Sequence, residues 1–351
     1  MSRHLRSATA AASLLLSLGF LQARAADAET DWKAVVALDA GPTGEPMRSA
    51  EAASQRITNH LARQEAALRG FLSAHPQDSH VFEAQLRLAR LLQIRADFEG
   101  TENLRAESKR ILDQLEKTVT PEQRPELEFA KIARLMRSLR QPSGPQRLEL
   151  LSAARSFEAA YPSDRRIAPL FLEVATLFDD DPKTKEALLE DAQAVAADPE
   201  SKGRAADDLK RVRLVGEEVP LHFTSLQGED IKAEDPQHRP TFVIFFADFS
   251  PASTQALAKL QQAVAQMPKG SVRVVGVSLD EKREALTTLL KTRNIAWPVA
   301  FDGLSWQSPV VRGFGINALP TVWLLDGHGR LRALNALDGA AERARQLAQE
   351  P

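Results

Sequence analysis

The stretch FVIFFADFSPAS, residues 242–253, constrains the fold of this chain more than any other. Five apolar residues, Phe242–Phe246, lead directly into a turn and then into a helical pattern. This order predicts a buried strand that delivers a short polar loop to the start of a helix. Backbone N–H groups are unpaired at a helix start and the helix dipole favours negative charge there, so many α/β proteins place chemistry at such loops. The polar side chains at this point are Ser250 and Ser253.

Strand-like and helix-like patterns alternate through residues 213–351, which we predict to be one domain. The expected order is strand 242–246, helix 256–267, strand 272–277, helix 281–292, strand 322–325 and a last helix from Gly339. The sequence Asp326-Gly327-His328-Gly329 predicts a hairpin turn after the last of these strands. Phe223-Thr224 and Asp230-Ile231 indicate a small leading hairpin. Such alternation implies a mixed sheet with helices on both faces.

Residues 46–212 predict a separate helical domain. Apolar residues recur there at helical spacing, as in Ile57, Leu61 and Leu68, and proline or glycine separates the segments. The fold class expected for the whole chain is therefore α plus α/β: a helical, repeat-like N-terminal domain followed by an α/β/α domain.

The helical part contains an internal repeat. Residues 69–92 (RGFLSAHPQDSHVFEAQLRLARLL) align without gaps with residues 155–178 (RSFEAAYPSDRRIAPLFLEVATLF). In each copy a helix ends near a proline, a Ser/Asp cap follows, and a second amphipathic helix packs back on the first. The pattern resembles tetratricopeptide repeats, whose stacked helices expose a groove for partners, although their consensus tryptophan and glycine are absent. The alternative is a helical domain that only packs on its neighbour.

Residues 1–25 predict a secretory signal peptide. Arg3 and Arg6 precede the apolar stretch 8–21, and Ala23-Arg24-Ala25 offers a small-residue cleavage site. The apolar stretch is shorter than the roughly 20 residues that span a membrane, which disfavours an anchor. Residues 26–45 are small, acidic and marked by glycine and proline, so we expect a linker or a poorly ordered arm, with Asp31-Trp32 and Val35-Val36 as the residues that would dock it locally. The protein is then expected to be exported, and the periplasm of a bacterium is the favoured compartment.

Charge and cysteine content exclude several classes of function. The formal net charge is −2, and loss of residues 1–25 with their three arginines and no acids leaves −5. A mildly acidic chain is a poor binder of nucleic acid or of anionic membrane. There is no cysteine, so disulfides, thiolate-ligated zinc and a lipid-bearing cysteine are all impossible.

The C-terminal domain resembles the thioredoxin-like family of exported thiol–disulfide proteins, the TlpA/ResA group, which is close to the AhpC/TSA peroxiredoxins. The segments that carry the resemblance lie in the family's order: GEEVPLHFTSLQGEDIKA, FVIFFADFSPAS, VRVVGVSLDEKREAL, WPVAFDG and GFGINALPTVWLLDGHGRL. The resemblance implies a redox loop at residues 249–253 and a cis-proline at Pro320. It also implies that extended polypeptide binds beside them, at Phe249, Pro251, Pro320 and Thr321.

Both cysteine positions of the family's W-C-x-x-C loop carry serine, at Ser250 and Ser253. In a peroxiredoxin alignment the peroxidatic cysteine also falls on Ser253. A thiol has a pKa of about 8.5, which a helix N-terminus lowers further, whereas a serine hydroxyl stays un-ionised there. A hydroxyl also forms neither a disulfide nor a sulfenic acid. Disulfide exchange and peroxide reduction are therefore chemically inaccessible to this chain, and no catalytic residue is expected.

Other chemistry is also disfavoured. A nucleophilic serine needs an adjacent base, and no histidine or lysine motif lies near the loop in sequence. We instead expect Ser250 to cap the helix, with Pro251 in its first position. Asp179-Asp180-Asp181 lacks the remaining features of a calcium loop and predicts a turn. We expect no metal and no cofactor, and we expect Trp297, Trp306 and Trp323 to lie in or near the core.

The sequence leaves three hypotheses for function. The leading one is a redox-inactive, non-catalytic module that binds a protein or peptide, with the helical domain as a second partner surface. The second is an enzyme, as the redox family would suggest. The third is a structural spacer that holds the thioredoxin-like domain near an envelope complex.

Overall fold

A computed structural model describes residues 27–43, 49–139 and 143–349. The predicted signal peptide, residues 1–25, lies outside these residues. The contacts divide the chain into two compact units, Met1–Gln141 and Pro142–Pro351. The predicted boundary at 212/213 separates helices from sheet, whereas the division of the units falls at 141/142, beside the proline- and glycine-rich sequence 142–145.

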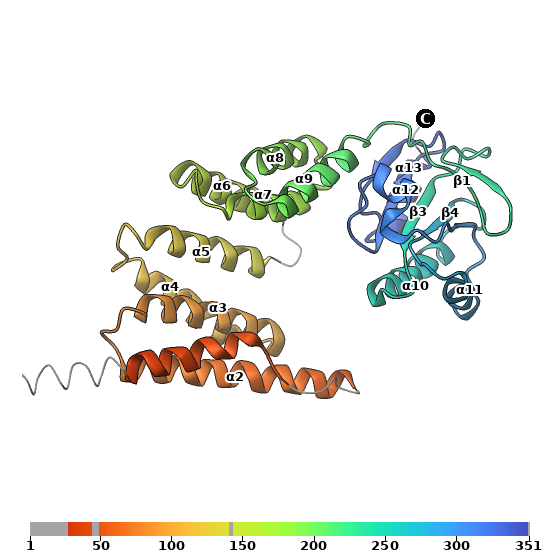
Figure 1. The fold of residues 1–351 in the computed structure, drawn as a ribbon. Helices are drawn as coiled ribbons and strands as arrows, with labels where there is room; N and C mark the ends of the chain where they lie inside the picture. Colours follow the sequence, from red (N-terminus) through yellow and green to blue (C-terminus); the bar gives the residue numbers. More distant parts are fainter. Residues whose placement is uncertain (1–26, 44–48, 140–142, 350–351) are drawn as a thin grey trace, which may run out of the picture. The chain divides into compact units, whose positions relative to one another are not determined.

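The first unit is helical. Its helices α2 to α5 stack on one another in sequence order (Figure 1). Their apolar stripes meet in two clusters, one around Phe71 and Leu92 and one around Leu112 and Leu127. The elements are η1 (Leu38–Ala40), α2 (Ala50–Ala74), α3 (Val81–Glu99), α4 (Glu102–Leu115) and α5 (Arg124–Ser138).

Residues 27–37, which we expected to belong to a linker, form a helix. Trp32 and Val35 are buried against α2 and α3, where the Trp32 ring stacks on His80 at 4.6 Å. The ring of His75 shares a hydrogen bond of 2.8 Å with Asp31, and His60 bonds the carbonyl oxygen of Leu38 at 2.9 Å. The segment is therefore docked on the helices through Asp31, Trp32 and Val35, which lie in the two pairs named from the sequence as its docking residues.

The second unit begins with four helices, α6 (Gly144–Ala160), α7 (Ile167–Ala175), α8 (Pro182–Val195) and α9 (Pro199–Val212), with the short η2 (Thr176–Phe178) after α7. The acidic run at 179–181 is a turn, as predicted, in which Asp181 caps α8 through the backbone N–H of Thr184 at 3.2 Å. Asp179 and Asp180 pair with Lys185 and Arg147.

The two copies of the internal repeat make the same turn. Asp78 accepts the backbone N–H of His80 at 2.9 Å, and Asp164 accepts that of Arg166 at 2.9 Å. In each copy, the helix before this turn ends at an aromatic residue, and the two residues have nearly the same backbone angles. They are His75 after α2 (φ −126°, ψ 57°) and Tyr161 after α6 (φ −134°, ψ 58°). Residues 86 positions apart in the sequence therefore make the same hydrogen bond and the same helix end in the two copies. The resemblance to tetratricopeptide repeats stays a prediction.

The rest of the second unit is an α/β domain built on a five-stranded sheet of order β5-β4-β3-β6-β7. Strand β3 is central and fully buried; it runs parallel to β4 and antiparallel to β6. The strands are β1 (His222–Thr224), β2 (Asp230–Lys232), β3 (Thr241–Phe246), β4 (Arg273–Ser278), β5 (Val299–Ala300), β6 (Thr321–Leu325) and β7 (Leu331–Ala333). The helices are α10 (Pro251–Ala265), α11 (Arg283–Thr292), η3 (Ser305–Gln307), α12 (Pro309–Gly313) and α13 (Ala340–Leu347).

Helices cover both faces of this sheet, as predicted. Phe242, Ile244 and Phe246 of β3 pack against α10, α11 and α13. On the opposite face the Trp323 ring lies 5.2 Å from Phe245 and 5.4 Å from Phe314, which follows α12. Trp323 is 1% exposed, so its predicted place in the core is confirmed.

The segment that connects helix α9 to the sheet is itself paired with the chain at the start of β7. Residues 215–219 run beside the start of β7 and the turn before it, where Val215 bridges Leu331 and Glu218 bridges Arg330. The backbone N–H of Gly216 donates to Leu331 at 2.7 Å, and that of Leu331 donates to Glu217 at 3.0 Å. Within the described ranges, no helix is both long and apolar enough to cross a bilayer.

Candidate functional site

The loop between β3 and α10 has the geometry predicted for it. Ser250 is the N-cap of α10, Pro251 occupies the first turn, and the Ser250 hydroxyl accepts the backbone N–H of Ser253 at 3.2 Å. Phe249 projects from the loop and is 59% exposed. The capping role that we predicted for Ser250 is confirmed, and the same bond occupies one of the helix-start N–H groups that could hold an anion.

Ser253 differs sharply from Ser250. It is 0% exposed, and its hydroxyl has no hydrogen-bond partner among the described residues. Ser250, by contrast, is only half-buried. A serine nucleophile needs a base within about 3 Å of its oxygen, and neither hydroxyl has one in the described structure. Ser250 is thus partly accessible and Ser253 is enclosed, and neither is an activated nucleophile.

The segment around Pro320 lies at the same edge of the sheet. The Leu319-Pro320 peptide bond is cis, as the resemblance implied. Thr321 pairs with Phe245 in the β3–β6 ladder, so the end of β3 and the start of β6 are neighbours. Pro320 and Thr321 are both half-buried, and the Thr321 hydroxyl donates to the carbonyl of Ala318 at 2.8 Å. The structure therefore brings the residue positions named from the sequence to one edge.

A buried carboxyl group holds the loop in place. Asp280, at the end of β4, is 3% exposed and accepts the backbone N–H of Asp248 at 2.8 Å. Its second oxygen accepts the hydroxyl of Ser278 at 2.8 Å. Burial raises the pKa of this carboxyl, and the two hydrogen bonds oppose the shift only in part. Sequence reasoning missed Asp280, although an acid directly after a buried apolar strand was a usable signal.

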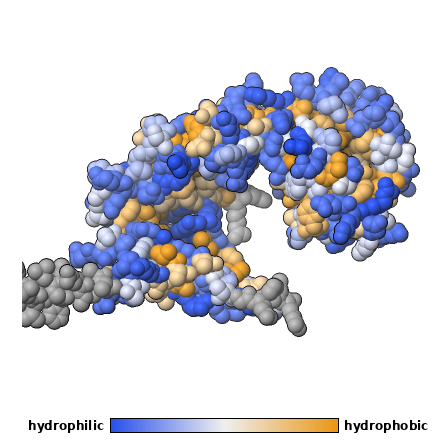
Figure 2. Space-filling model, in the orientation of Figure 1, coloured by the Kyte–Doolittle hydropathy of each residue, from blue (hydrophilic) through white to orange (hydrophobic). Residues whose placement is uncertain are grey.

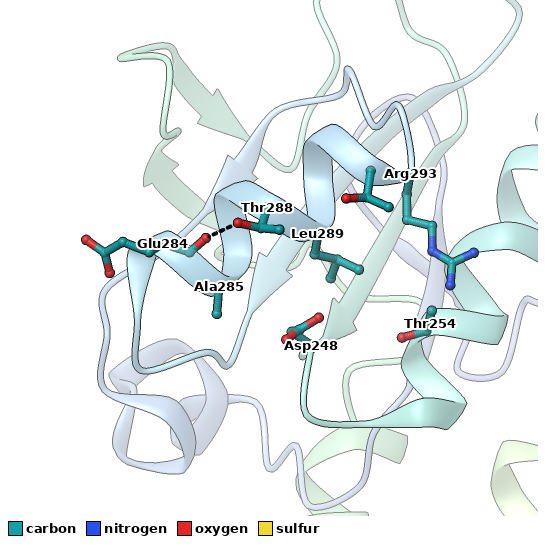
Figure 3. Close-up of a pocket in the computed structure, with 8 residues that line it drawn as sticks. Asp248, Thr254, Glu284, Ala285, Thr288, Leu289 and Arg293 are labelled. Carbon is teal, nitrogen blue, oxygen red and sulfur yellow. Dashed lines mark hydrogen bonds between the residues drawn. The ribbon is translucent and has the colours of Figure 1, made fainter. Parts of the chain in front are cut away.

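A pocket of about 480 Å³ opens next to this loop, between the start of α10 and α11. Figure 3 shows Asp248, Thr254 and Leu289 around the pocket. Glu284 and Thr288 line it from α11, and Arg293 lines it from just after the end of that helix. Its lining mixes both charges with hydroxyl groups, and most of these side chains are exposed. The pocket is therefore a surface hollow beside the loop and does not enclose a reacting group.

Three large apolar side chains are exposed in the described part of the α/β domain, and all three lie at this edge. They are Phe249 after β3, and Leu304 (50% exposed) and Trp306 (39% exposed) after β5. Both loops contact the loop after β4, which lies between them. Asp248 of the first loop bonds Asp280, and in the second loop a Cβ at Gly303 would lie 3.5 Å from the carbonyl oxygen of Glu281. Figure 2 shows apolar patches between hydrophilic residues on the visible face of this domain. We expected Trp306 in or near the core; the 3₁₀ turn η3 instead turns it outward.

Titration of Asp280 should give this domain an unusual pH dependence. Because its pKa is raised, the folded protein keeps a proton that the unfolded chain releases, so stability falls as the pH rises through the folded pKa. Asp280→Asn removes that fall. We expect the free energy of unfolding of this variant, relative to the unmodified protein, to increase between pH 4 and pH 8 in urea titrations.

Asp235 supplies the matched control, because it is also buried but its pKa is shifted in the opposite direction, below the ordinary aspartate value. Burial raises its pKa, yet the bonds from Arg239 and the charge of Arg273 outweigh this and lower it. Its stabilisation is present above the ordinary aspartate pKa and is lost as the pH falls through the lowered one. Asp235→Asn should therefore weaken the protein at neutral pH and lose its effect in acid. Parallel pH profiles for the two variants would contradict both assignments.

The comparisons with known proteins identify this part of the chain. Residues 215–334 match the AhpC/TSA family. The match covers the five-stranded sheet, the Ser250 loop and the cis-proline. The α/β domain that contains this match has a thioredoxin-like fold. No curated protein matches the chain.

Solved structures similar to the thioredoxin-like domain cover little more than a third of the chain. A thiol-disulfide oxidoreductase from Bacteroides fragilis is 25% identical, with a TM-score of 0.32 over 35% of this chain and 97% of that one. The thioredoxin domain of a thiol-disulfide oxidoreductase from Bacteroides vulgatus is 17% identical, with a TM-score of 0.35 over 38% and 98%. StoA from Bacillus subtilis is 21% identical, with a TM-score of 0.30 over 35% and 96%.

Proposed function

We propose that this chain is an exported, redox-inactive thioredoxin-like protein that binds a protein or peptide at the edge formed by Phe249, Pro251, Pro320 and Thr321. One observation carries the proposal: the exposed large apolar side chains described in the domain gather at this edge and nowhere else in it. Exposed large apolar side chains at one edge of a domain are typical of an interaction site.

The chemistry of the loop supports binding rather than turnover. The fold, the helix cap and the cis-proline are present, but hydroxyls replace both sulfur atoms. A hydroxyl at the cap position still leaves Phe249 and the backbone at Thr321 available to a ligand. Insulin reduction and peroxide consumption by the pure protein should both equal the buffer blank. Turnover above the blank by either assay would overturn the claim of redox inactivity.

Capture from the source cell's envelope tests the binding itself. Tagged protein, after mild crosslinking, should enrich a specific partner over an untagged control. The double variant Leu304→Ser/Trp306→Ser should lose most of that enrichment, because both side chains are exposed at the same edge of the sheet as the four residues of the proposed contact surface. Leu148→Ser is the matched control: Leu148 is 60% exposed, but it lies on α6 outside the thioredoxin-like domain.

The outcomes are separable. If no protein is enriched over the untagged control, the proposed function is wrong. Equal enrichment by the unmodified protein and the double variant would show that binding occurs elsewhere, for example on the helices. Loss by the Leu148 variant alone would move the binding surface to α6.

A further inference from the structure

Two histidines from distant parts of the chain meet at the end of the sheet opposite the Ser250 loop. His238 precedes β3, and His328 lies in the turn between β6 and β7. Their ring centroids are 5.1 Å apart, and the ring planes are tilted by 46°. Both residues are exposed. Thr241 pairs with Leu325 in the β3–β6 ladder, and this register places the chain before β3 beside the chain after β6.

The ring nitrogens of this pair are not engaged by the protein. No hydrogen bond holds the ring nitrogens of His238 or His328 within the part of the chain that the structure describes. The other histidines of that part each bond an oxygen through a ring nitrogen; they are His60, His75, His80 and His222. The nitrogen lone pairs of His238 and His328 are therefore available to a metal ion, for which neutral imidazole is a common ligand.

The two turns that carry the histidines are fixed against each other. A Cβ added at Gly327 would overlap the carbonyl oxygen of His238, so the two backbones are in direct contact. Asp326 accepts the backbone N–H of His328 at 3.0 Å and so holds the second turn. His238 has φ 53°, in the left-handed region, and strained residues of this kind cluster at functional sites. The two side chains therefore start from a rigid frame, which lowers the cost of ordering them around a shared ion.

The charges next to the pair do not oppose a bound cation. Arg239, which follows His238, pairs with the buried Asp235 at 2.7 Å. Arg330, two residues after His328, lies 3.8 Å from Glu218. Because an acid accompanies each arginine, their repulsion of a cation at the two rings is reduced.

The separation of the rings suits zinc. Zinc bonds imidazole nitrogen at about 2.1 Å with tetrahedral angles, an arrangement in which the centroids of two ligating rings lie about 5 Å apart. The observed 5.1 Å agrees with this value. Among the described residues, no group of three or more His, Cys, Asp or Glu side chains could hold a metal, so water or an external ligand would fill the remaining positions. Imidazole ligands also favour zinc over magnesium and calcium, which prefer oxygen.

We propose that His238 and His328 form a zinc-binding site with two protein ligands and open coordination positions. The site lies at the opposite end of β3 from Phe249 and does not depend on the proposed function. Zinc bound there joins the turn before β3 to the β6–β7 turn. It stabilises the folded domain, because the unfolded chain does not hold together two residues that are 90 positions apart. That separation in the sequence is also why sequence reasoning predicted no metal.

The test titrates ZnCl₂ into the full chain, freed of any affinity tag, by isothermal titration calorimetry. The variants are His238→Asn, in which asparagine tolerates the left-handed backbone, and His328→Ala. Each should raise the dissociation constant for zinc at least about tenfold, because loss of even an outer-shell partner costs about ten- to a hundredfold. His222→Ala is the matched control, since His222 is an exposed histidine of the same domain whose ring bonds Asp230. This control should leave the constant unchanged.

Thermal unfolding gives a second measurement, in which each protein is compared with and without zinc. Zinc should raise the unfolding midpoint of the unmodified protein and of the His222 variant, and it should leave the His238 and His328 variants unchanged. MgCl₂ should raise none of the midpoints. Because each protein is its own reference, a variant that is less stable in itself still reports on zinc.

The remaining outcomes contradict the site. No zinc binding by the unmodified protein would overturn it, and so would equal binding by the unmodified protein and both variants, which would mean that the two rings are only in contact. Loss in just one of the two variants would overturn shared ligation, because both rings must bind the same ion. Loss in the His222 variant alone would move the site to the β1–β2 hairpin.

Discussion

The thiol of a Ser250→Cys variant is expected to react with iodoacetamide at least about a hundredfold faster than that of Ser253→Cys. Position 250 is half-buried at the start of α10, where its side chain accepts the N–H of residue 253 and where the helix dipole stabilises a thiolate. Position 253 is fully enclosed and has no hydrogen-bond donor beside its side chain among the described residues. Alkylation followed by mass spectrometry measures both rates, and the unmodified chain, which has no cysteine, is the blank.

The double variant Ser250→Cys/Ser253→Cys extends this experiment. The Ser250 oxygen already lies 3.2 Å from the backbone nitrogen of Ser253, so we expect the two thiols to form an intramolecular disulfide under air. Insulin reduction by the reduced variant should then rise above the zero expected of the unmodified protein. Equal alkylation rates in the single variants, or no disulfide in the double one, would show that the loop has lost the geometry of a redox site along with its sulfur.

Gly315→Ala should be among the most destabilising single substitutions in the second unit. Gly315 has φ +66°, and its Cβ would lie 2.4 Å from the carbonyl oxygen of Asp207, a backbone atom that no side-chain rotation can move. Left-handed strain alone costs about 1–3 kcal/mol, and the clash adds to it. We expect a loss of at least about 3 kcal/mol in the free energy of unfolding, measured with urea.

Gly216→Ala separates the two contributions. Gly216 has φ +91° but open space within 4 Å of the added Cβ, so this variant carries only the strain. It should lose about 1–2 kcal/mol. If the Gly315 variant were no less stable than the Gly216 variant, the backbone of α9 at Asp207 would not press against the loop at Gly315.

The sequence predicted those parts of the fold whose causes are local. The apolar run Phe242–Phe246 must be buried, and a Ser-Pro pair after it caps a helix, so both the strand and the Ser250 cap could be foreseen. The leading hairpin and the turn at 326–329 follow from glycine and aspartate in the same way. Strand β5 and helix α12, two and five residues long, are too short to leave a periodic pattern.

The features of the site that escaped prediction depend on distant contacts. Trp306 looks like a core residue by type, and only the position of η3 after β5 exposes it. Asp280 looks like a surface residue, and only the neighbouring β3 loop makes it a buried acceptor. The bonds between Arg211 and the loop at 315–317 join residues more than 100 positions apart, which periodicity cannot reveal.

The pairing of residues 215–219 with the start of β7 also bears on solubility. Strand β7 ends the sheet, and an uncovered edge offers its N–H and C=O groups to the edge of another molecule. Val215 and Glu218 occupy part of that edge. A fragment cut after Glu218 would keep all seven strands but would uncover this part of the edge, so we expect residues 215–218 to hinder the folded domain from pairing with copies of itself.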